Sequence, residues 1–209
     1  AALFGASLEA EPAARFNIAP TQEIAVVRRD ESKGPALTMV RWGLVPFWAK
    51  DPSIGNRMIN ARAETVAEKP SFRAAYRKRR CLIPADGFYE WHISDGKKVP
   101  WFISLKSAQT FAFAGLWESW LDKATGETLE TAAIITTEAN EFMHRLHHRM
   151  PVIMEAGETD GWLSGDDDAL ADAIKNTPPC QAWPVDRRVN NARNVGRDLI
   201  DPAGDLISA

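Results

Sequence analysis

Three short blocks hold the polar side chains that are best suited to chemistry. They are the Asn-Ala-Arg-Ala-Glu-Thr block at 60–65, the Gly-Phe-Tyr-Glu-Trp block at 87–91 and the His-His-Arg-Met-Pro block at 147–151. Each block supplies one reactive group: the amide of Asn60, the carboxylate of Glu90 and the imidazole of His147. If these groups meet in one cleft, they can orient a nucleophile, accept its proton and protonate a leaving oxygen. We therefore interpret the chain as a candidate enzyme with Asn60, Glu90 and His147 as its catalytic residues.

Glu90 lies in a segment that reads as a strand, so its neighbours alternate between two faces. Phe88, Glu90 and His92 share one face, and Tyr89 and Trp91 share the other. A carboxylate among aromatic side chains must be paired, protonated or in contact with water in a cleft. Burial would raise its pKa toward the range that suits proton transfer. The alternative is a Glu on an exposed face.

His147 follows a short predicted helix and precedes Arg149 and Pro151. A single histidine is often structural, but a loop position beside an arginine favours a catalytic role. His144 and His148 are four residues apart, as metal-binding histidines on a helix can be. No H-E-x-x-H pattern and no nearby carboxylate ligand accompany them, so we predict no metal site and no cofactor.

Arg62 lies two residues after Asn60, so on an extended segment the two side chains point the same way. A guanidinium binds phosphate or carboxylate through two hydrogen bonds. An aromatic-rich loop at 42–48 precedes this block, and aromatic faces near arginines suit the unstacked bases of a single strand. We expect Trp48 foremost among the eight tryptophans to contact a ligand, and most of the others to lie in the core. The alternative for Asn60 and Arg62 is a role in turn and surface contacts.

The charge of the chain is unevenly distributed. The net charge of −3 argues against a protein that coats nucleic acid indiscriminately. Residues 57–80 hold eight Lys/Arg and two Glu, a balance of +6, whereas 155–172 hold seven Asp/Glu and no Lys/Arg, a balance of −7. One interpretation is a positive groove for phosphates with an acidic far side. The other is a solvated basic helix beside a solvated acidic one, and charge alone does not separate the two.

Length and composition fit one globular domain over residues 1–209. The 209 residues are 45% hydrophobic and 25% charged, which is enough for a core without metal or disulfide support. No apolar run is long enough to span a membrane, and no secretory signal is visible. Cys81 and Cys180 form no C-x-x-C pair, so we expect no disulfide framework and a cytoplasmic setting.

Short strands and a few helices must position the three blocks. We predict strands at 23–28, 37–41, 81–84, 88–93, 99–105, 111–117, 131–136, 151–154 and 181–185, and helices at about 70–80, 140–146, 161–163 and 168–175. Turns are predicted at 33–35 and 95–96. This order indicates an α+β single domain with a curled or barrel-like, mostly antiparallel sheet. On the first helix, we expect Phe72, Ala75 and Tyr76 to form a buried stripe and Arg73, Arg77 and Arg80 to share a separate face.

Five ordered blocks together resemble the SRAP family, the SOS response-associated peptidase domain proteins that shield abasic sites in single-stranded DNA. The resemblance covers nearly the whole chain and rests on Asn17-x-Ala19-Pro20-Thr21, Trp42-Gly43-Leu44-x-Pro46-x-Trp48, Asn60-Ala61-Arg62-x-Glu64-Thr65, Gly87-Phe88-Tyr89-Glu90-Trp91 and His147-x-Arg149-Met150-Pro151. It implies an amino-terminal Cys whose amine forms an imine with the abasic aldehyde and whose thiol then closes a thiazolidine ring. It also implies removal of the initiator Met by the protein itself.

The resemblance assigns a role to each site residue. Asn60 resembles the amide that positions the amine, Glu90 the group that accepts and donates protons, and His147 the acid that protonates the sugar ring oxygen. The residues that the resemblance implies for DNA binding are Arg62 on a phosphate and Asn17, Pro20, Trp48 and Thr136 along the groove. From the basic helix itself we add Arg73 and Arg77 as DNA-binding residues. The expected partner is single-stranded DNA with abasic sites, bound by a monomer that associates with the nucleoid.

The printed chain departs from this pattern because it has no Cys-Gly-Arg start. Ala1–Gly5 looks like the end of a helix with Gly5 as its stop signal, so we expect the nucleophilic Cys to lie upstream. Two other functions stay open at this point. One is a single-strand binding module without enzymatic activity, and the other is a peptidase acting on other proteins, for which no Ser/His/Asp or metal motif is present.

Overall fold

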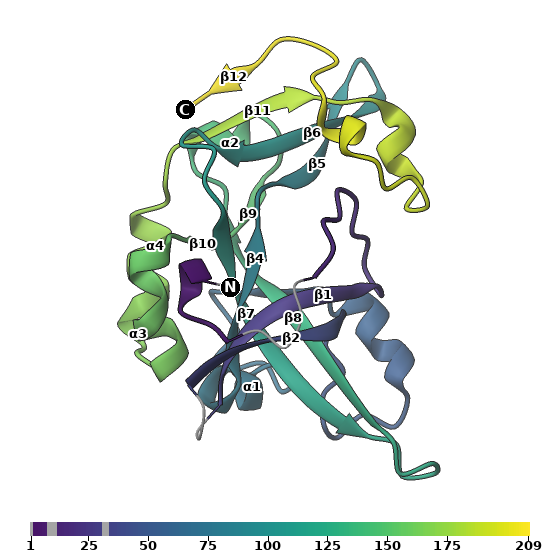
Figure 1. The fold of residues 1–209 in the computed structure, drawn as a ribbon, viewed down its shortest axis with the longest axis vertical. Coiled ribbons are helices and arrows are strands. Elements are labelled where there is room, and N and C mark those ends of the chain that lie inside the picture. Colours follow the sequence, from purple (N-terminus) through teal and green to yellow (C-terminus); the bar gives the residue numbers. More distant parts are fainter. Residues whose placement is uncertain (1, 8–11, 31–33) are drawn as a thin grey trace.

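Five strands close into a barrel in the computed structural model, which describes residues 2–7, 12–30 and 34–209. The ring runs β7–β4–β1–β2–β8 and back to β7 (Figure 1). Its strands are β1 (Glu23–Asp30), β2 (Gly34–Trp42), β4 (Arg80–Ala85), β7 (Phe111–Leu121) and β8 (Thr128–Glu138). The barrel-like fold class is thereby confirmed. The sheet is mixed, however, because β2 pairs with β8 in parallel while the other ring contacts are antiparallel.

The far end of β8 carries two extra strands, and this end matters for the site. β3 (Asn60–Arg62) runs parallel to β8 on one side, and β9 (Arg149–Pro151) runs antiparallel on the other. Thr136 pairs with Arg62 of β3 and with Pro151 of β9. Two of the three sequence blocks are therefore strands that flank the same residue of β8. The short strand β10 (Ile153–Met154) continues from β9 and pairs with β7.

A second sheet of four antiparallel strands carries the Glu90 block. Its order is β12 (Ile207–Ser208), β11 (Cys180–Pro184), β6 (Lys97–Leu105) and β5 (Phe88–Ser94), which leaves β5 at an edge. The predicted turn joins β5 to β6: Asp95 and Gly96 have φ of 50° and 71°, as a tight hairpin turn requires. Figure 1 shows this sheet stacked above one end of the barrel.

The alternation of side chains divides the core into two clusters. Ile134 of β8 belongs to a cluster that extends from the barrel to the small sheet through Ile103 and Ala182. Ile135, its neighbour, belongs to a cluster on the opposite face, together with Trp162. The four α-helices are short and peripheral: α1 (Arg73–Lys78), α2 (Glu141–His144), α3 (Thr159–Ser164) and α4 (Asp168–Lys175). Five 3-10 turns complete the described elements: η1 (Ala2–Phe4), η2 (Pro52–Arg57), η3 (Ala156–Glu158), η4 (Arg187–Asn190) and η5 (Arg197–Ile200).

Arg80 differs from the sequence prediction. Helix α1 ends at Lys78, so Arg80 starts β4 and is only 7% exposed. Its guanidinium lies over the rings of Tyr76 and Trp162, at 4.5 and 4.6 Å from their centroids, and bonds the carboxylate of Asp167 at 2.6 Å. Arg73 and Arg77 remain exposed. The basic segment is therefore joined to the acidic one through Arg80, so the two charged regions are in contact.

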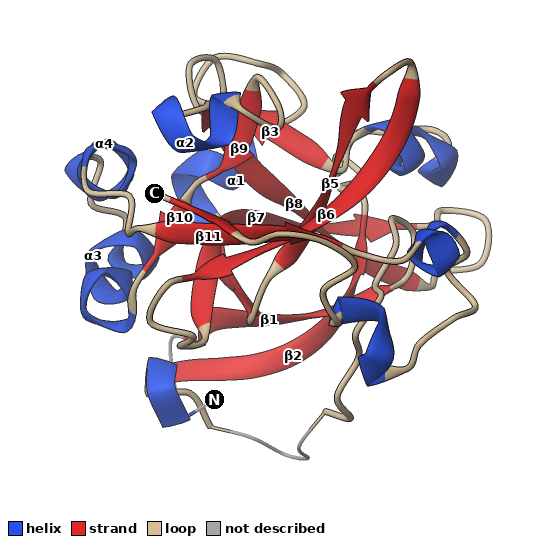
Figure 2. Cartoon of the chain, turned by 90° about the horizontal axis from the view of Figure 1, so that it is seen from above, coloured by secondary structure: helices blue, strands red, loops and turns tan. Residues whose placement is uncertain are grey.

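The described N-terminal residues lie on the outside of the barrel. Phe4 is buried in the second cluster, Gly5 has φ of 59° as expected after a helical turn, and Ser7 forms a parallel bridge with Ala36 of β2. Figure 2 shows this end beside β2, on the side of the molecule opposite to α2, β3 and β9. Residue 33 of the predicted turn at 33–35 lies outside the described ranges, and residues 34 and 35 belong to β2. No helix in the described part is long and apolar enough to cross a membrane.

Candidate active site and nucleic-acid interface

Glu90 and His147 come together although they are far apart in sequence. Glu90 lies on edge strand β5, and His147 lies in the turn between α2 and β9. The turn is held over the Glu90 face of β5, because the Nδ1 atom of His92 lies 3.3 Å from the carbonyl oxygen of Leu146. Phe88, on the same face, packs edge-on against Phe113 with ring centroids 5.7 Å apart. The structure therefore places a carboxyl group and an imidazole in one half-buried region.

Burial raises the pKa of the Glu90 carboxyl above its ordinary value, while the nearby His147 acts in the opposite direction. A raised pKa brings the carboxyl group closer to the range in which it can both accept and return a proton. The exposed-face alternative for Glu90 does not fit this environment.

His147 is anchored through one ring nitrogen. Its Nδ1 atom lies 3.1 Å from both the backbone nitrogen and the backbone oxygen of Arg149. Depending on the tautomer, Nδ1 accepts a hydrogen bond from the Arg149 N–H or donates one to the Arg149 carbonyl. Either bond fixes the orientation of the ring. The rings of His147 and His148 also stack, with centroids 4.3 Å apart.

An ion pair joins the Asn60 block to the His147 block. Arg149 donates from Nη1 and Nη2 to the two carboxylate oxygens of Glu64, at 2.8 and 2.9 Å. Nη2 also donates to the carbonyl of Thr136 at 2.8 Å. The hydrogen bond from Arg149 holds the pKa of Glu64 below its usual range. Both residues lie in the sequence blocks described above, but their pairing was not predicted. They are 85 residues apart, and no local pattern relates them.

Arg62 opens onto a cavity of about 330 Å³. The residues that line it are Arg62, Glu138, His144, His148 and Arg149. Arg62 is exposed and, among the described residues, forms no ion pair, so its guanidinium is available to an anion. His144 and His148 therefore border the same cavity, but they share no helical face because α2 ends at His144. In the part of the chain that the structure describes, no group of three His, Cys, Asp or Glu side chains is arranged to hold a metal ion.

Asn60 lies beside Arg62 at the surface. Both side chains are exposed on β3, with buried Ala61 between them. Two hydrogen bonds hold Ile59, the residue before Asn60. Its carbonyl accepts from the Trp42 indole and from the Ile134 N–H, each at 3.0 Å. Asn60 makes no hydrogen bond to Glu90 or His147 within the described ranges. Its convergence with those two groups therefore remains a prediction.

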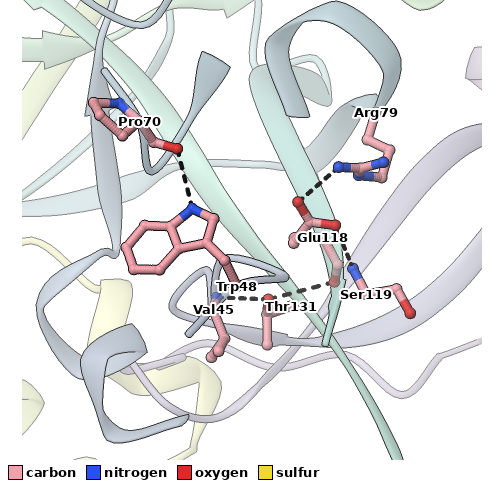
Figure 3. A network of polar contacts seen from close by, with 7 residues as sticks. All are labelled: Val45, Trp48, Pro70, Arg79, Glu118, Ser119 and Thr131. Atoms are coloured by element: carbon pink, nitrogen blue, oxygen red, sulfur yellow. Dashed lines mark hydrogen bonds and ion pairs between the residues drawn. The ribbon is translucent and has the colours of Figure 1, made fainter. Parts of the chain in front are cut away.

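Trp48 lies beside the start of the basic segment. Its ring is 48% exposed, and its indole N–H donates to the carbonyl of Pro70 at 3.4 Å (Figure 3). The loop that carries Trp48 is anchored on β8, where the Val45 N–H donates to the Thr131 hydroxyl at 2.9 Å. A hollow of about 380 Å³ next to Trp48 also contains Lys50 and Arg57.

The same view shows how the end of the basic segment is fixed to the barrel. Arg79 pairs with the buried carboxylate of Glu118 on β7 at 2.7 Å (Figure 3). Arg73 and Arg77 of the same segment are exposed and provide positive charge, and Trp48 provides an exposed aromatic ring. Such side chains can contact both the phosphates and the bases of a single strand.

Two predicted groove residues are mostly buried. Asn17 is 6% exposed, and its Nδ2 group bonds the carbonyls of Val189, Asn191 and Asn194 at 3.0, 3.3 and 3.1 Å. These bonds make the Nδ2 group of Asn17 a structural anchor, and a contact of Asn17 with DNA stays a prediction. Thr136 is 9% exposed, and its hydroxyl accepts from Nη2 of Arg149 at 3.4 Å, so its contact with DNA stays a prediction.

Pro20 is exposed, in a turn followed by Thr21 at a φ of 74°. A positive φ is rare for a β-branched residue, and such strain gathers at functional sites. The turn is tied to the end of β2, because the Thr21 N–H donates to the Trp42 carbonyl at 2.8 Å. Pro20 is therefore accessible, as a DNA-contacting residue must be.

Comparison with known proteins decides the family. The family model described as SOS response associated peptidase (SRAP) matches residues 2–192. The chain belongs to the SRAP family. Its SRAP relatives include the abasic site processing protein YoaM of Bacillus subtilis (strain 168), 45% identical over 201 residues, covering 89% of this chain and 84% of that protein. The abasic site processing protein HMCES of Xenopus tropicalis is 31% identical over 189 residues, covering 78% of this chain and 56% of that one.

Solved structures support the SRAP fold assignment. A crystal structure of a protein from Bacteroides thetaiotaomicron superposes with a TM-score of 0.76 at 29% identity, covering 88% of this chain and 82% of that one. A protein from Bordetella bronchiseptica gives a TM-score of 0.71 at 26% identity, covering 88% and 93% of the two chains. The expected resemblance and the single barrel-like domain architecture are therefore both confirmed.

Proposed function

We propose that this SRAP protein processes abasic sites in single-stranded DNA by capturing the aldehyde of the opened sugar in a covalent crosslink. The observation that carries the proposal is the half-buried approach of Glu90 and His147, in a protein whose relatives are named abasic site processing proteins. An aldehyde needs an amine nucleophile and a group that moves protons during addition and loss of water. Glu90 has the environment for that second role.

The proposed reaction has two steps. An amino-terminal α-amine, with a reference pKa of roughly 8, adds to the aldehyde carbon, and loss of water gives an imine. The thiol of the same cysteine then adds to the imine carbon, and its proton goes to the nitrogen, which closes a five-membered thiazolidine. Glu90 accepts the amine proton and returns it to the departing hydroxyl. Before these steps, His147 protonates the ring oxygen of the closed sugar while the anomeric hydroxyl gives its proton to water, so the ring C–O bond breaks and the aldehyde forms.

The nucleophile in this proposal is the α-amine of an amino-terminal cysteine, which the described residues do not include. Phe4 is packed in the second core cluster and Ser7 bridges Ala36, so the described start of the chain lies along β2. Cys81 and Cys180 are buried side chains within strands and have no α-amine of their own. The same Glu90 would act as the base that removes an initiator Met, which accounts for peptidase in the family name.

DNA binding follows from the surface on both sides of β3. Arg62 holds a phosphate at the 330 Å³ cavity, and Asn60 beside it orients the amine. Trp48, Arg73 and Arg77 provide the aromatic and cationic surface for the rest of the strand. These contacts position the strand and do not recognise its sequence, because the protein recognises the exposed aldehyde instead of a base.

The test is crosslinking by the protein with its natural N-terminus. We would incubate it with a single-stranded oligonucleotide that has one abasic site and resolve the products on a denaturing gel. The wild type should give a shifted band with abasic but not with undamaged DNA. Glu90→Gln and His147→Ala should slow its formation by about 100-fold or more, as expected for loss of a general acid or base.

Arg62→Ala serves as the binding arm, with Arg29→Ala on β1 as a control that removes equal charge from another exposed position. Arg62→Ala should weaken DNA affinity and lower the salt slope by about one, while Arg29→Ala should leave both unchanged. Equal binding of undamaged and abasic strands without a denaturant-resistant band would instead identify a binding module. Cleavage of an added peptide that depends on Glu90 would identify a peptidase acting in trans.

A further inference from the structure

The edge strand β5 is held from the side opposite to Glu90. Within the described ranges β5 pairs with β6 alone, so one of its two edges has no neighbouring strand. Tyr89 and Trp91, which flank Glu90, point to the other face of the strand. Whatever these two side chains bind therefore helps to set the position of the Glu90 carboxyl group.

Both flanking side chains make hydrogen bonds to segments distant in sequence. The Tyr89 hydroxyl donates to the carbonyl oxygen of Phe16 at 2.7 Å. The Trp91 indole N–H donates to the side-chain oxygen of Asn190 at 2.7 Å. Burial raises the pKa of Tyr89 to about 12, so its hydroxyl keeps its proton and remains a donor at neutral pH.

Asn17 joins the two distant segments to each other. It follows Phe16 directly, and its buried amide bonds three carbonyls of the segment 189–194, which includes Asn190. The segment is itself a compact turn, because the Asn194 side chain donates to the carbonyl of Arg188 at 2.8 Å. One amide thus closes a ring of contacts that begins at Tyr89 and returns to Trp91.

Aromatic packing fills the space inside this ring. Tyr89 meets Phe102 of β6 with centroids 5.4 Å apart, and Phe102 meets Trp183 of β11 at 5.3 Å. Val189 is buried in the same small cluster. The ring is therefore a rigid support beneath β5, built from residues near both ends of the printed chain.

We propose that Asn17 is a positioning residue for Glu90: through the closed ring of contacts it fixes edge strand β5 at the depth that brings the carboxyl group against His147. This inference rests on the proposed function for its consequence in catalysis, but not for its structural part. The titratable groups that face Glu90 are His147 from the α2–β9 turn and His92 from β5 itself. Asn17 touches neither of them nor any group proposed to contact DNA.

The first experiment follows the Glu90 carboxyl group by ¹³C NMR over a pH titration, without DNA. Asn17→Ala should lower the pKa of Glu90 toward the ordinary value of about 4.3, because a displaced β5 admits water. Tyr89→Phe, which removes only the hydroxyl, is the milder variant if Asn17→Ala is too unstable to titrate. Asn176→Ala, an exposed position at the end of α4, is the control and should leave the titration unchanged.

The second experiment separates positioning from direct DNA contact. With abasic single-stranded DNA at saturation, Asn17→Ala and Tyr89→Phe should slow crosslinking by about 10- to 100-fold, the effect of a small misplacement of a reacting group. Their DNA affinity and its salt slope should match those of the wild type. A weaker affinity with a reduced slope and an unchanged rate would show that Asn17 contacts DNA, and would overturn the inference.

The two experiments fail independently. If the wild-type protein forms no crosslink, the proposed function is wrong, and the NMR titration still decides the role of Asn17. If a folded Asn17→Ala or Tyr89→Phe protein titrates Glu90 as the wild type does, the positioning role is refuted even where crosslinking is intact. Thermal unfolding of each variant confirms that the measurements are made on folded protein.

Discussion

The ion pair between Glu64 and Arg149 is the contact whose energy tests the assembly of the site most directly. Glu64 belongs to the Asn60 block and Arg149 to the His147 block, so this pair connects two of the three sequence motifs. The perturbation is a double-mutant cycle with Glu64→Gln, Arg149→Lys and the combined variant. The cycle isolates the energy of the pair. Arg149→Lys changes the bond to the Thr136 carbonyl equally in the wild type and in Glu64→Gln, so this contribution cancels.

The expected coupling lies between that of a surface pair and that of a buried pair. The pair has two parallel hydrogen bonds of 2.8 and 2.9 Å, and its side chains are 17% exposed for Arg149 and 44% exposed for Glu64. Exposed pairs contribute about 0.2–1 kcal/mol, whereas breaking a buried pair costs about 3–5 kcal/mol. Because the Glu64 carboxylate is partly exposed to water, the coupling energy should be lower than that of a buried pair, and we expect about 1–2 kcal/mol.

The assay is unfolding in urea at several pH values. Because Arg149 lowers the pKa of Glu64 in the folded protein, the contribution of the pair is complete above the unfolded value near 4.3 and is lost as the pH falls through the lowered folded value. The wild type should therefore lose stability relative to Glu64→Gln only in this acidic window. Crosslinking rates of the same variants measure whether the pair also sets the position of His147.

A second pair in the protein is a matched reference. Arg28 and Glu130 form the same two-bond geometry at 2.7 and 2.8 Å, with side chains 19% and 34% exposed, and no site residue is in contact with them. Its cycle should give a similar stability coupling but no coupling in the crosslinking rate. A coupling near zero for Glu64 and Arg149, or equal rate effects for both pairs, would refute the reasoning.

Three further predictions concern single side chains. Glu90→Gln should stabilise the protein near pH 7, because burial raises the pKa of Glu90 and so the charged form opposes folding; urea unfolding should show this gain disappear as the pH falls below about 4.3. Burial raises the pKa of Cys180 to about 11 and raises that of Cys81 further, so alkylation of both thiols at pH 8 should be about 100-fold slower in the folded than in the denatured protein. Trp48→Ala should weaken binding of an undamaged single strand by about 1–3 kcal/mol in a fluorescence titration, with an unchanged crosslinking rate at saturation.

The local elements could be predicted because short-range patterns determine them. Alternating apolar residues predicted β5, β6 and β7 with boundaries correct to within a few residues. Asp95-Gly96 predicted the turn between β5 and β6. Asn140 begins α2 as a cap, since its side chain accepts from the Met143 N–H at 2.9 Å. The boundaries were less accurate where tertiary contacts compete, as at Arg80, which two aromatic rings and an aspartate draw into the interior.

The amino-acid order by itself determined the barrel-like class, the three reactive blocks and the candidate chemistry of Glu90 and His147. Only the tertiary structure decided which blocks meet, because strand pairing and burial depend on residues far apart in the chain. Arg149 finds Glu64 across 85 residues, and Asn17 finds Val189 across 172. Such contacts leave no periodic signal, so the sequence did not reveal that the buried Asn17 amide bonds carbonyls of the segment 189–194. The physical reason is that the hydrogen-bond partners around a side-chain amide determine its role, and these partners come together only when the chain folds.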